Sequence, residues 1–492
     1  ELDIDRNLTI TGAGSGSTTL SYSNTSDFSV VFFSGGGSST LEGFTISSTH
    51  RRAVWIENNS NVTLDDIVVD GMTWRTNGGV INCDSGTLTV SNSEFTNNSA
   101  GGPGGVILSY CDTTISNSTF DSNSAVTAGG AVLVWGGDLV LDTVDMDTGS
   151  APWGGLVYVA NGDLTVTDGS YESGTATNGG GALLQYEETL GTYTATIDGA
   201  TFTDNTTSGD GGALWTVGTD TVDLDDLTFT GNSAGSSGGA VYINRDGSLS
   251  STITVTMDDL VFDTNTGVDF GGGAYVAYSD LTGDTLSFTD TSTTIYNGGA
   301  MAIAAVLGDV ALTNVDIDTA SAVDGGGIYA NTSAAGADFS LTTATVLDAN
   351  ATDQGGGIYL DGFTTVALDD VWLEDCDAAY GGAVFTNDAA SVDMASSFLC
   401  DNSATVSGGG IYGESSTTGW DITNTVLVEN SAVTGGGLYL DTIADLTMTN
   451  DTILGNTAST QGGGGYLTGT DMTLRNTLWS NNASGIGLYG VS

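Results

Sequence analysis

One short motif recurs through most of the chain: two glycines, a small residue, one or two aliphatic residues and often an aromatic residue. The first copy begins at Gly78 and the fifteenth at Gly462, so that 14 steps cover 384 residues and the mean period is near 27. A unit of this length cannot close a hydrophobic core by itself, whereas stacked units bury a continuous core. The period therefore predicts a repeat architecture rather than a set of separate globular domains.

A second motif alternates with the first. An aromatic or aliphatic residue is followed by two spacers and an asparagine, and the preceding segment, such as 88–95, alternates apolar with polar residues. Such alternation is typical of β-strands with one buried face. We expect the asparagine at a turn, where its amide satisfies backbone groups and bonds to the asparagines of neighbouring coils. The predicted asparagine ladder consists of Asn98, Asn123, Asn205, Asn232, Asn265, Asn402, Asn430 and Asn456.

These patterns predict an all-β chain that forms a single right-handed parallel β-helix (β-solenoid) of about 17 coils of roughly 27 residues. Residues 1–77 supply degenerate N-terminal coils and residues 78–492 the regular ones, in one continuous domain. In the glycine strands, aliphatic residues such as Val241 and Ile243 are expected to point inward. The glycine pair is expected where φ is positive or where a neighbouring sheet lies close.

The two motifs in regular alternation resemble the repeat of the chlamydial polymorphic outer-membrane proteins (Pmp) and of related bacterial β-helix surface proteins. The resemblance covers roughly residues 78–482. It implies a passenger that is displayed outside the cell and is often adhesive. The family typically carries a C-terminal membrane β-barrel, whereas this sequence ends at Ser492 within the repeat register. We therefore expect an extracellular or cell-surface chain, secreted or associated with the outer membrane, that does not itself insert into a membrane.

The charge of the chain limits its partners. Sixty acidic residues against six basic ones give a net charge of −54, which repels nucleic acid and anionic membranes and attracts divalent cations. Apolar runs are far shorter than the roughly 18 residues of a membrane helix. We expect the partner to be a protein or a glycan at a surface, or a second copy of the chain.

Four cysteines form two pairs, Cys83 with Cys111 and Cys376 with Cys400, separated by 28 and 24 residues. Both separations are close to the repeat length, so the members of each pair are expected on neighbouring coils. An oxidising compartment would allow two disulfides. Two pairs of buried free thiols are the alternative.

The supply of catalytic residues argues against an enzyme. His50 is the single histidine, which leaves no basis for a Ser–His or Cys–His arrangement or for histidine-ligated metals. Pairs of aspartates recur at one phase of the repeat, and a recurring pair indicates scaffold, whereas a catalytic site is normally unique. We therefore expect no catalytic residue. Stacked carboxylates repel one another without a counter-ion, which makes calcium the one candidate cofactor, with Asp225, Asp226, Asp258 and Asp259 as its predicted ligands.

Two surfaces are candidates for binding. The fifth residue of the glycine motif is aromatic in most later coils, and these rings form an exposed contact stripe if the flanking aliphatic residues point inward. If the face is inverted, the rings belong to the core; their exposure distinguishes the two cases. The stripe consists of Trp215, Tyr242, Tyr275, Tyr329, Tyr359, Phe385, Tyr412, Tyr439 and Tyr466. Longer coils also place projecting loops along one edge, where solenoids often bind, with Glu187, Glu188, Arg245 and Asp246 as candidates.

Three functions remain open at this stage. The first is a non-enzymatic, adhesin-like or interacting surface protein. The second is a structural subunit of an extracellular fibre or surface layer, assembled end to end or side by side. The third is a polysaccharide lyase or hydrolase, because β-helices also host such enzymes and fold does not decide function.

Overall fold

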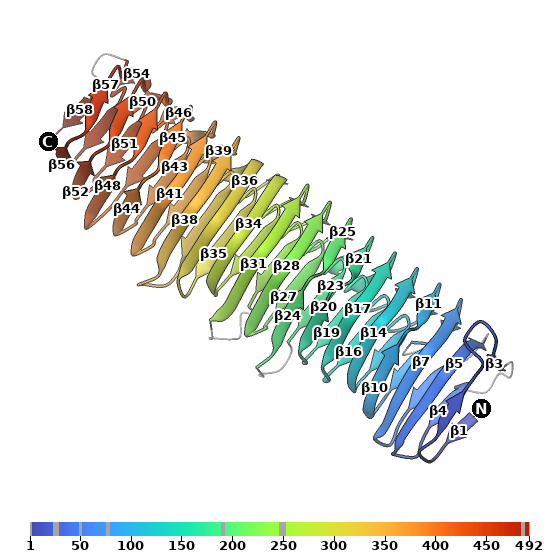
Figure 1. The fold of residues 1–492 in the computed structure, drawn as a ribbon. Coiled ribbons are helices and arrows are strands. Elements are labelled where there is room, and N and C mark those ends of the chain that lie inside the picture. Colours follow the sequence, from blue (N-terminus) through green and yellow to red (C-terminus); the bar gives the residue numbers. More distant parts are fainter. Residues whose placement is uncertain are drawn as a thin grey trace. The chain divides into compact units, whose positions relative to one another are not determined.

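The structure is a computed structural model that describes residues 2–22, 29–48, 52–74, 79–187, 192–245, 252–483 and 488–491 (Figure 1). These residues belong to two compact units: unit 1 is Glu1–Gly235 with Ala240–Ser251, and unit 2 is Ser236–Gly239 with Thr252–Ser492. Every regular element among the described residues is a β-strand, and neighbouring coils pair in parallel. Each unit is a right-handed parallel β-solenoid, and the two contain about 17 coils of about 27 residues, which confirms the predicted fold class. The predicted continuity of one domain over residues 78–492 stays a prediction.

One sheet, here called sheet A, takes one strand from each coil, and in the coils that carry the glycine motif this strand follows the glycine pair. In unit 1 its strands are β1 (Leu2–Ile4), β4 (Val31–Phe33), β6 (Val54–Ile56), β9 (Ile81–Cys83), β13 (Ile107–Ser109), β16 (Val132–Trp135), β19 (Val157–Ala160), β23 (Leu183–Tyr186), β27 (Leu214–Val217) and β30 (Val241–Asn244). In unit 2 they are β33 (Ala274–Ala277), β35 (Met301–Val306), β37 (Ile328–Thr332), β40 (Ile358–Asp361), β43 (Val384–Asn387), β47 (Ile411–Glu414), β51 (Leu438–Asp441), β55 (Gly465–Thr468) and β58 (Leu488–Val491).

The rest of each coil belongs to a second sheet, and the coil that follows β19 is typical. It contains β20 (Leu164–Thr167), β21 (Ser170–Glu172) and β22 (Thr175–Gly179). The segment predicted as one alternating strand is thus two strands here, because Asp168 between them has a φ of 56°. Aspartate and asparagine tolerate this left-handed conformation better than most residues. The same turn explains the recurring aspartate pairs, since the second member of each has positive φ: Asp66, Asp226, Asp259 and Asp370.

The core contains the residues that the alternation assigns to it. Val241 and Ile243 are fully buried, as predicted for the glycine strand. The aromatic residue of the second motif is also buried and stacks on its equivalent in the next coil. The ring centroids of Phe95 and Phe120 lie 4.8 Å apart, and those of Phe262 and Phe288 lie 4.6 Å apart. Each unit therefore contains rows of identical contacts along its interior.

Glycine is required at the two positions of the motif for different structural reasons. The first, as at Gly381 with a φ of 64°, takes the left-handed conformation that glycine adopts without strain. The second, as at Gly382, has no room for a side chain, because a Cβ would lie within 3.0 Å of backbone atoms of Gly409 and Ser403 in the next coil. Both explanations proposed from the sequence therefore apply, one to each glycine.

The asparagines of the second motif lie buried in the turn and bond from coil to coil. Asn98 donates its backbone N–H and its Nδ2 to Oδ1 of Asn123, at 3.0 and 3.1 Å. In unit 2, Asn402, Asn430 and Asn456 repeat this arrangement over consecutive coils. Asn205 bonds to Asn232 in the same way, and Asn265 is fully buried. The ladder satisfies turn backbone groups that would otherwise be buried without a partner.

Asp451 is an acidic residue at a turn position that is occupied by uncharged residues in the preceding coils. At the equivalent position of the preceding coils, Ser397 and Thr425 donate their hydroxyls to backbone carbonyls. Asp451 is 2% exposed, its Oδ1 accepts the N–H of Thr425 at 2.9 Å, and its Oδ2 has no hydrogen-bond partner among the described residues. Burial raises the pKa of this carboxyl from 3.8 to about 6. Between about pH 4 and 6 the folded chain therefore holds a proton here that the unfolded chain releases.

We expect Asp451→Thr to stabilise unit 2 in a pH-dependent way. The pKa of Asp451 is higher in the folded chain than in the unfolded chain. Its contribution to stability is therefore complete below pH 3.8 and is lost as the pH rises through about 6. Urea unfolding at pH 4, 6 and 8 should show a gain for the variant over the parent that grows to about 2 kcal/mol at pH 8. The exposed Asp471→Thr is the control. A gain that does not change with pH would show that Asp451 is already ionised without penalty.

Candidate functional site

The outer face of sheet A carries the side chains that alternate with the core residues. In β40, Ile358 and Leu360 are fully buried in the interior, whereas Tyr359 and Asp361 lie on the outside and are partly covered. The parallel register repeats this arrangement in neighbouring coils, with Tyr359 beside Phe385 and Asp361 beside Asn387. Two parallel outer rows follow, and they differ between the units.

In unit 2 the row that contains Tyr359 is a continuous stack of aromatic rings. Successive centroids lie 4.8–5.2 Å apart with interplanar angles of 4–12°. The stack consists of Tyr329, Tyr359, Phe385, Tyr412, Tyr439 and Tyr466. The rings therefore lie outside the core, on the side that the alternation predicts. They are half-buried by one another, however, and Phe385 is only 3% exposed.

The second outer row of unit 2, which contains Asp361, is polar, and two of its side chains form hydrogen bonds with phenol hydroxyls of the stack. Nδ2 of Asn331 donates to the hydroxyl of Tyr329 at 3.0 Å, and the hydroxyl of Tyr412 donates to Oε2 of Glu414 at 3.0 Å. Burial, and then the nearby carboxylate of Asp361, raises the pKa of Tyr359. This stack thus presents ring edges and bonded hydroxyls, while the ring faces are turned against each other. A sugar ring would find no free aromatic face to stack on here, which argues against a glycan as the partner of the predicted contact stripe.

In unit 1 the corresponding outer face is apolar. Trp215 and Tyr242 of the predicted stripe stack with centroids 6.2 Å apart, and they belong to a cluster that extends toward the N-terminus. The cluster consists of Leu108, Ala128, Leu133, Tyr158, Ala160, Leu184, Trp215 and Val217, with Tyr186 and Tyr242 packed against it. It is a second small core on the outside of the sheet. The aromatic pattern of the motif does not reveal this cluster, although the fifth residue of the motif is leucine in three of these coils: Leu108, Leu133 and Leu184.

A pocket, here called the outer pocket, opens at the N-terminal part of this cluster. Its volume is about 290 Å³. Strands β13, β16 and β19 supply its floor, and the segments before their glycine pairs supply a wall. The lining residues are Pro103, Leu108, Tyr110, Thr127, Ala128, Leu133, Trp135, Trp153 and Tyr158. Tyr110 is 50% exposed, and Trp135 and Trp153 are each 39% exposed, so the rim is aromatic.

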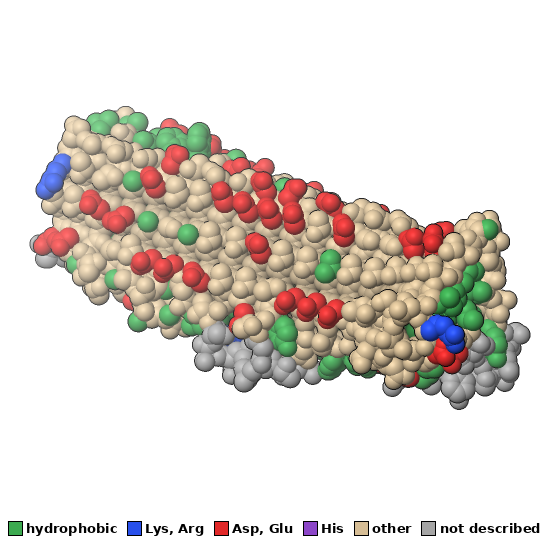
Figure 2. All heavy atoms as spheres, turned by 60° about the horizontal axis from the view of Figure 1, so that its bottom comes forward, with side chains coloured by type: hydrophobic (Ala, Val, Ile, Leu, Met, Phe, Trp, Pro, Cys, Tyr) green, Lys and Arg blue, Asp and Glu red, His purple; other side chains and the backbone are tan. Residues whose placement is uncertain are grey.

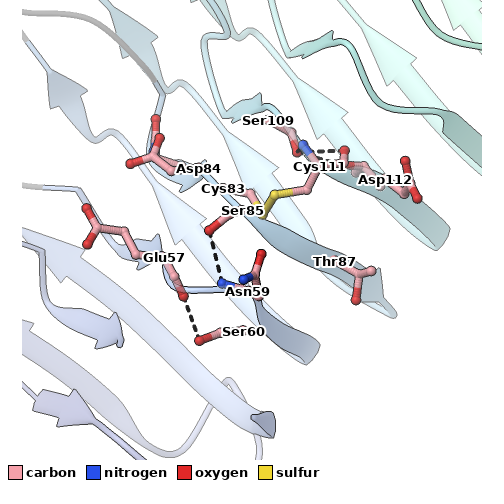
Figure 3. The surroundings of a disulfide bond; sticks show 12 residues. Glu57, Asn59, Ser60, Cys83, Asp84, Ser85, Thr87, Ser109, Cys111 and Asp112 are labelled. Atoms are coloured by element: carbon pink, nitrogen blue, oxygen red, sulfur yellow. Dashed lines mark hydrogen bonds between the residues drawn. A yellow bond between two sulfur atoms is a disulfide. The ribbon is translucent and has the colours of Figure 1, made fainter. Parts of the chain in front are cut away.

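The first cysteine pair forms a disulfide close to this rim. Cys83 at the end of β9 bonds to Cys111 (Figure 3). In the sequence, Cys111 directly follows the rim residue Tyr110. Both sulfurs are buried, and the hydroxyl of Ser109 donates to the carbonyl of Cys111 at 3.0 Å. In register, Cys83 lies beside Ser109 and not beside Cys111, so the bridge crosses two residues diagonally. It ties the rim segment to the preceding coil.

We expect the loss of this bridge to destabilise unit 1. A Cys83→Ser, Cys111→Ser variant should lose about 3 kcal/mol of unfolding free energy, because the bridge closes a loop of 28 residues in the unfolded chain. A reductant should lower the urea concentration at the midpoint of unfolding for the parent chain and leave it unchanged for the variant. Identical midpoints with and without reductant in the parent would contradict the bridge.

The second predicted disulfide is wrong: Cys376 and Cys400 are free and buried. The local coil repeats after 26 residues, since Leu373 lies beside Leu399, so a separation of 24 places the two cysteines at different points of the coil. Cys376 occupies the ladder position, where its N–H donates to Oδ1 of Asn402 at 3.0 Å. Cys400 lies beside Glu374 instead. Burial raises the pKa of both thiols to about 12.

The aspartates predicted to bind calcium are divided between the two units, and their role stays a prediction. Asp225 and Asp226 belong to unit 1, Asp258 and Asp259 to unit 2, and all four side chains are exposed. Among the described residues, the one cluster in which at least three acidic, cysteine or histidine ligand atoms lie within 4.8 Å of one another is Glu374, Cys400 and Asp401. None of the predicted calcium ligands belongs to it.

The predicted loop edge is described only in part. Glu187 is buried at the end of β23 and lies beneath Gly218, and Arg245 follows β30 and donates its N–H to Oδ1 of Asn244 at 2.7 Å. Glu188 and Asp246 lie outside the described residues. The described pair therefore belongs to the ends of two sheet A strands, close to the same outer face as the apolar cluster.

Comparison with known proteins addresses the repeat itself. The model of the Chlamydia polymorphic membrane protein repeat matches residues 199–217 and 226–244. These two segments are similar to the Pmp repeat. Each matched segment runs from the left-handed turn through the buried phenylalanine and the ladder asparagine to the end of a sheet A strand, and so includes both motifs. The predicted resemblance to the Pmp repeat is confirmed.

The remaining comparisons add little. No curated protein matches the chain. Among solved structures, the PL6 family alginate lyase AlyGC aligns with 99% of this chain and 96% of its own, at 11% identity and a TM-score of 0.23. A similarity at that level supports no conclusion about activity. The described residues form no helix of the length and apolarity needed to span a bilayer.

Proposed function

We propose that this Pmp-type repeat chain is a non-enzymatic, adhesin-like protein of the cell exterior that binds its partner through the outer face of sheet A in unit 1. The observation that carries the proposal is the apolar cluster on that face, which ends in an open pocket with an aromatic rim. The rim residues Tyr110, Trp135 and Trp153 are exposed, and large apolar side chains that are exposed together often mark an interaction site. Tryptophan and tyrosine are also the residues that contribute most to protein interfaces.

The rest of the surface supports binding rather than catalysis. On the face drawn in Figure 2, acidic side chains form short rows and basic side chains are few. The aspartate pairs that could serve as catalytic acids each place their second member in a left-handed turn, as at Asp226 and Asp370. This role is structural and recurs from coil to coil, which is the arrangement expected for scaffold.

The proposal is tested on intact cells of the source organism. Antibodies raised against the purified chain should label the outer surface, and the chain coated on beads should attach to a target surface that the antibodies then protect. Labelling only after the cells are broken would overturn the external location. Release of reducing ends or unsaturated products from polysaccharides would overturn the non-enzymatic reading and favour a lyase or hydrolase. Light scattering that shows fibres at low ionic strength would favour the structural subunit instead.

A further inference from the structure

The outer pocket differs from the aromatic stack of unit 2 because two of its rings, Tyr110 and Trp135, are exposed and not stacked on other described rings. Tyr110 and Trp135 make no ring contact with another aromatic residue among those described, and both are substantially exposed. The floor is well packed, with Leu108 and Leu133 each 3% exposed. A ligand group that enters would therefore meet preformed apolar walls and would displace water that has few hydrogen-bond partners there.

The polarity of the pocket selects the ligand group. None of its nine lining residues is acidic or basic, although the chain has 60 acidic residues. Its polar side-chain groups are the hydroxyl of Thr127, the phenols of Tyr110 and Tyr158, and the indole N–H groups of Trp135 and Trp153. A sugar ring would have to bury several hydroxyls with few partners, at a cost for each unpaired group. An aliphatic or aromatic side chain loses nothing of this kind, so the pocket favours an uncharged apolar group.

A row of carboxylates borders the pocket. Asp112 follows the rim residue Tyr110 by two positions, and Asp138 follows Trp135 by three. Oδ1 of Asp112 accepts the N–H of Asp138 at 3.2 Å, and Oδ1 of Asp138 accepts the N–H of Asp163 at 3.0 Å. This aspartate row therefore continues from coil to coil. No cation pairs with its three members among the described residues.

We propose that the outer pocket binds one apolar side chain of a basic protein segment, while Asp112, Asp138 and Asp163 receive the lysine or arginine residues that flank it. This inference rests on the proposed function and names the partner of its site. Charge complementarity selects this occupant: a second copy of the chain would bring a further net charge of −54 and the same row of aspartates. The apolar anchor supplies affinity, and the flanking charges supply steering and orientation.

The test uses the full chain and short dye-labelled peptides, each with a central Trp, Phe, Leu or Ile flanked by lysine and arginine. Fluorescence anisotropy at low salt should show binding of at least one peptide, about tenfold tighter than a peptide with Ser at the centre. Added salt should weaken it, because the flanking contacts are exposed. A Tyr110→Ala, Trp135→Ala variant should bind at least about tenfold more weakly.

The aspartate row has a matched control within the chain. Asp112→Asn, Asp138→Asn and Asp163→Asn together keep the acceptor oxygens for the backbone and remove the charge, so the fold should survive while peptide binding falls about tenfold. In unit 2, Asp280, Asp309 and Asp338 form the same type of row, with N–H donors at 3.0–3.3 Å, and the equivalent triple exchange should leave binding unchanged. Urea unfolding checks that all variants fold.

Several results would overturn the inference. The apolar anchor would be refuted if none of the four peptides bound more tightly than the Ser-centred peptide. The role of the aspartate row would be refuted if the unit 2 triple exchange weakened binding as much as the unit 1 exchange, or if an acidic version of the peptide also bound. Tighter binding of neutral oligosaccharides than of the peptides would replace the protein segment by a glycan. Bead attachment that survives in the pocket variants would refute the pocket while leaving the proposed function intact. Labelling confined to broken cells, together with specific peptide binding, would do the reverse.

Discussion

Gly382→Ala is expected to destabilise unit 2 by about 4 kcal/mol or more. The added Cβ would lie within 3.0 Å of three backbone atoms, the carbonyl oxygen of Gly409 and the nitrogen and oxygen of Ser403. Backbone atoms cannot move aside as a flexible side chain can. The coils around residues 382 and 409 would have to separate, which breaks the parallel hydrogen bonds between them.

Urea unfolding followed by circular dichroism measures this loss, and hydrogen exchange locates it. Exchange should accelerate first in β43 and β47, the strands on either side of the new methyl group. Gly16→Ala is the matched control, because a Cβ there has no atom within 4 Å and should change stability by no more than about 0.5 kcal/mol. If the two variants unfold at the same urea concentration, close approach of the coils does not explain the second glycine of the motif.

The coil architecture could be predicted because it repeats. Each interior position is occupied by the same kind of residue in many coils, so Val241, Phe229 and Asn232 each have equivalents that make the pattern visible. Stacking then follows from the requirement that a 27-residue unit bury its apolar side against a neighbour. The periodicity therefore carries information on the interior and on the turns, where one coil constrains the next.

The outer face could be predicted only in part, because its residues vary from coil to coil. The alternation correctly assigns Tyr359 and Tyr412 to the outside, yet it does not reveal that their rings cover one another. The outer pocket depends on Trp153, which lies before its glycine pair and outside the motif. Its wall arises from the three-dimensional stacking of different segments, which a single repeat cannot encode.

The cysteines illustrate the same limit. Separations of 28 and 24 both differ from the local period of 26 by two residues, so sequence spacing treats them alike. The structure separates them by position in the coil. Cys83 and Cys111 both lie at the exit of sheet A strands, whereas Cys376 takes the place of a ladder asparagine inside the turn. Whether a disulfide forms thus depends on which part of the coil each residue occupies, and not on the spacing alone.

A break in the asparagine ladder is expected to have the second large effect. The side chain of Asn430 makes four buried hydrogen bonds: Oδ1 accepts from the N–H and Nδ2 of Asn402, and Nδ2 donates to the carbonyl of Leu399 and to Oδ1 of Asn456. Asn430→Ala leaves these partners buried and unpaired. We expect a loss of about 4 kcal/mol, since each orphaned buried group costs about 1–3 kcal/mol and part of this is recovered by relaxation.

Two further variants separate the ladder from a general loss of an amide. Asn350→Ala removes an exposed asparagine of the same unit, whose Nδ2 donates to a single carbonyl, and should change stability by no more than about 0.5 kcal/mol. Asn430→Asp keeps the acceptor for Asn402 but points an oxygen at the carbonyl of Leu399 and at Oδ1 of Asn456. Its carboxyl can relieve this repulsion only by holding a proton, so the variant should be more stable at pH 4 than at pH 8 relative to the parent. Equal stability of Asn430→Asp relative to the parent at both pH values would mean that water enters the turn and that the ladder is not a buried network.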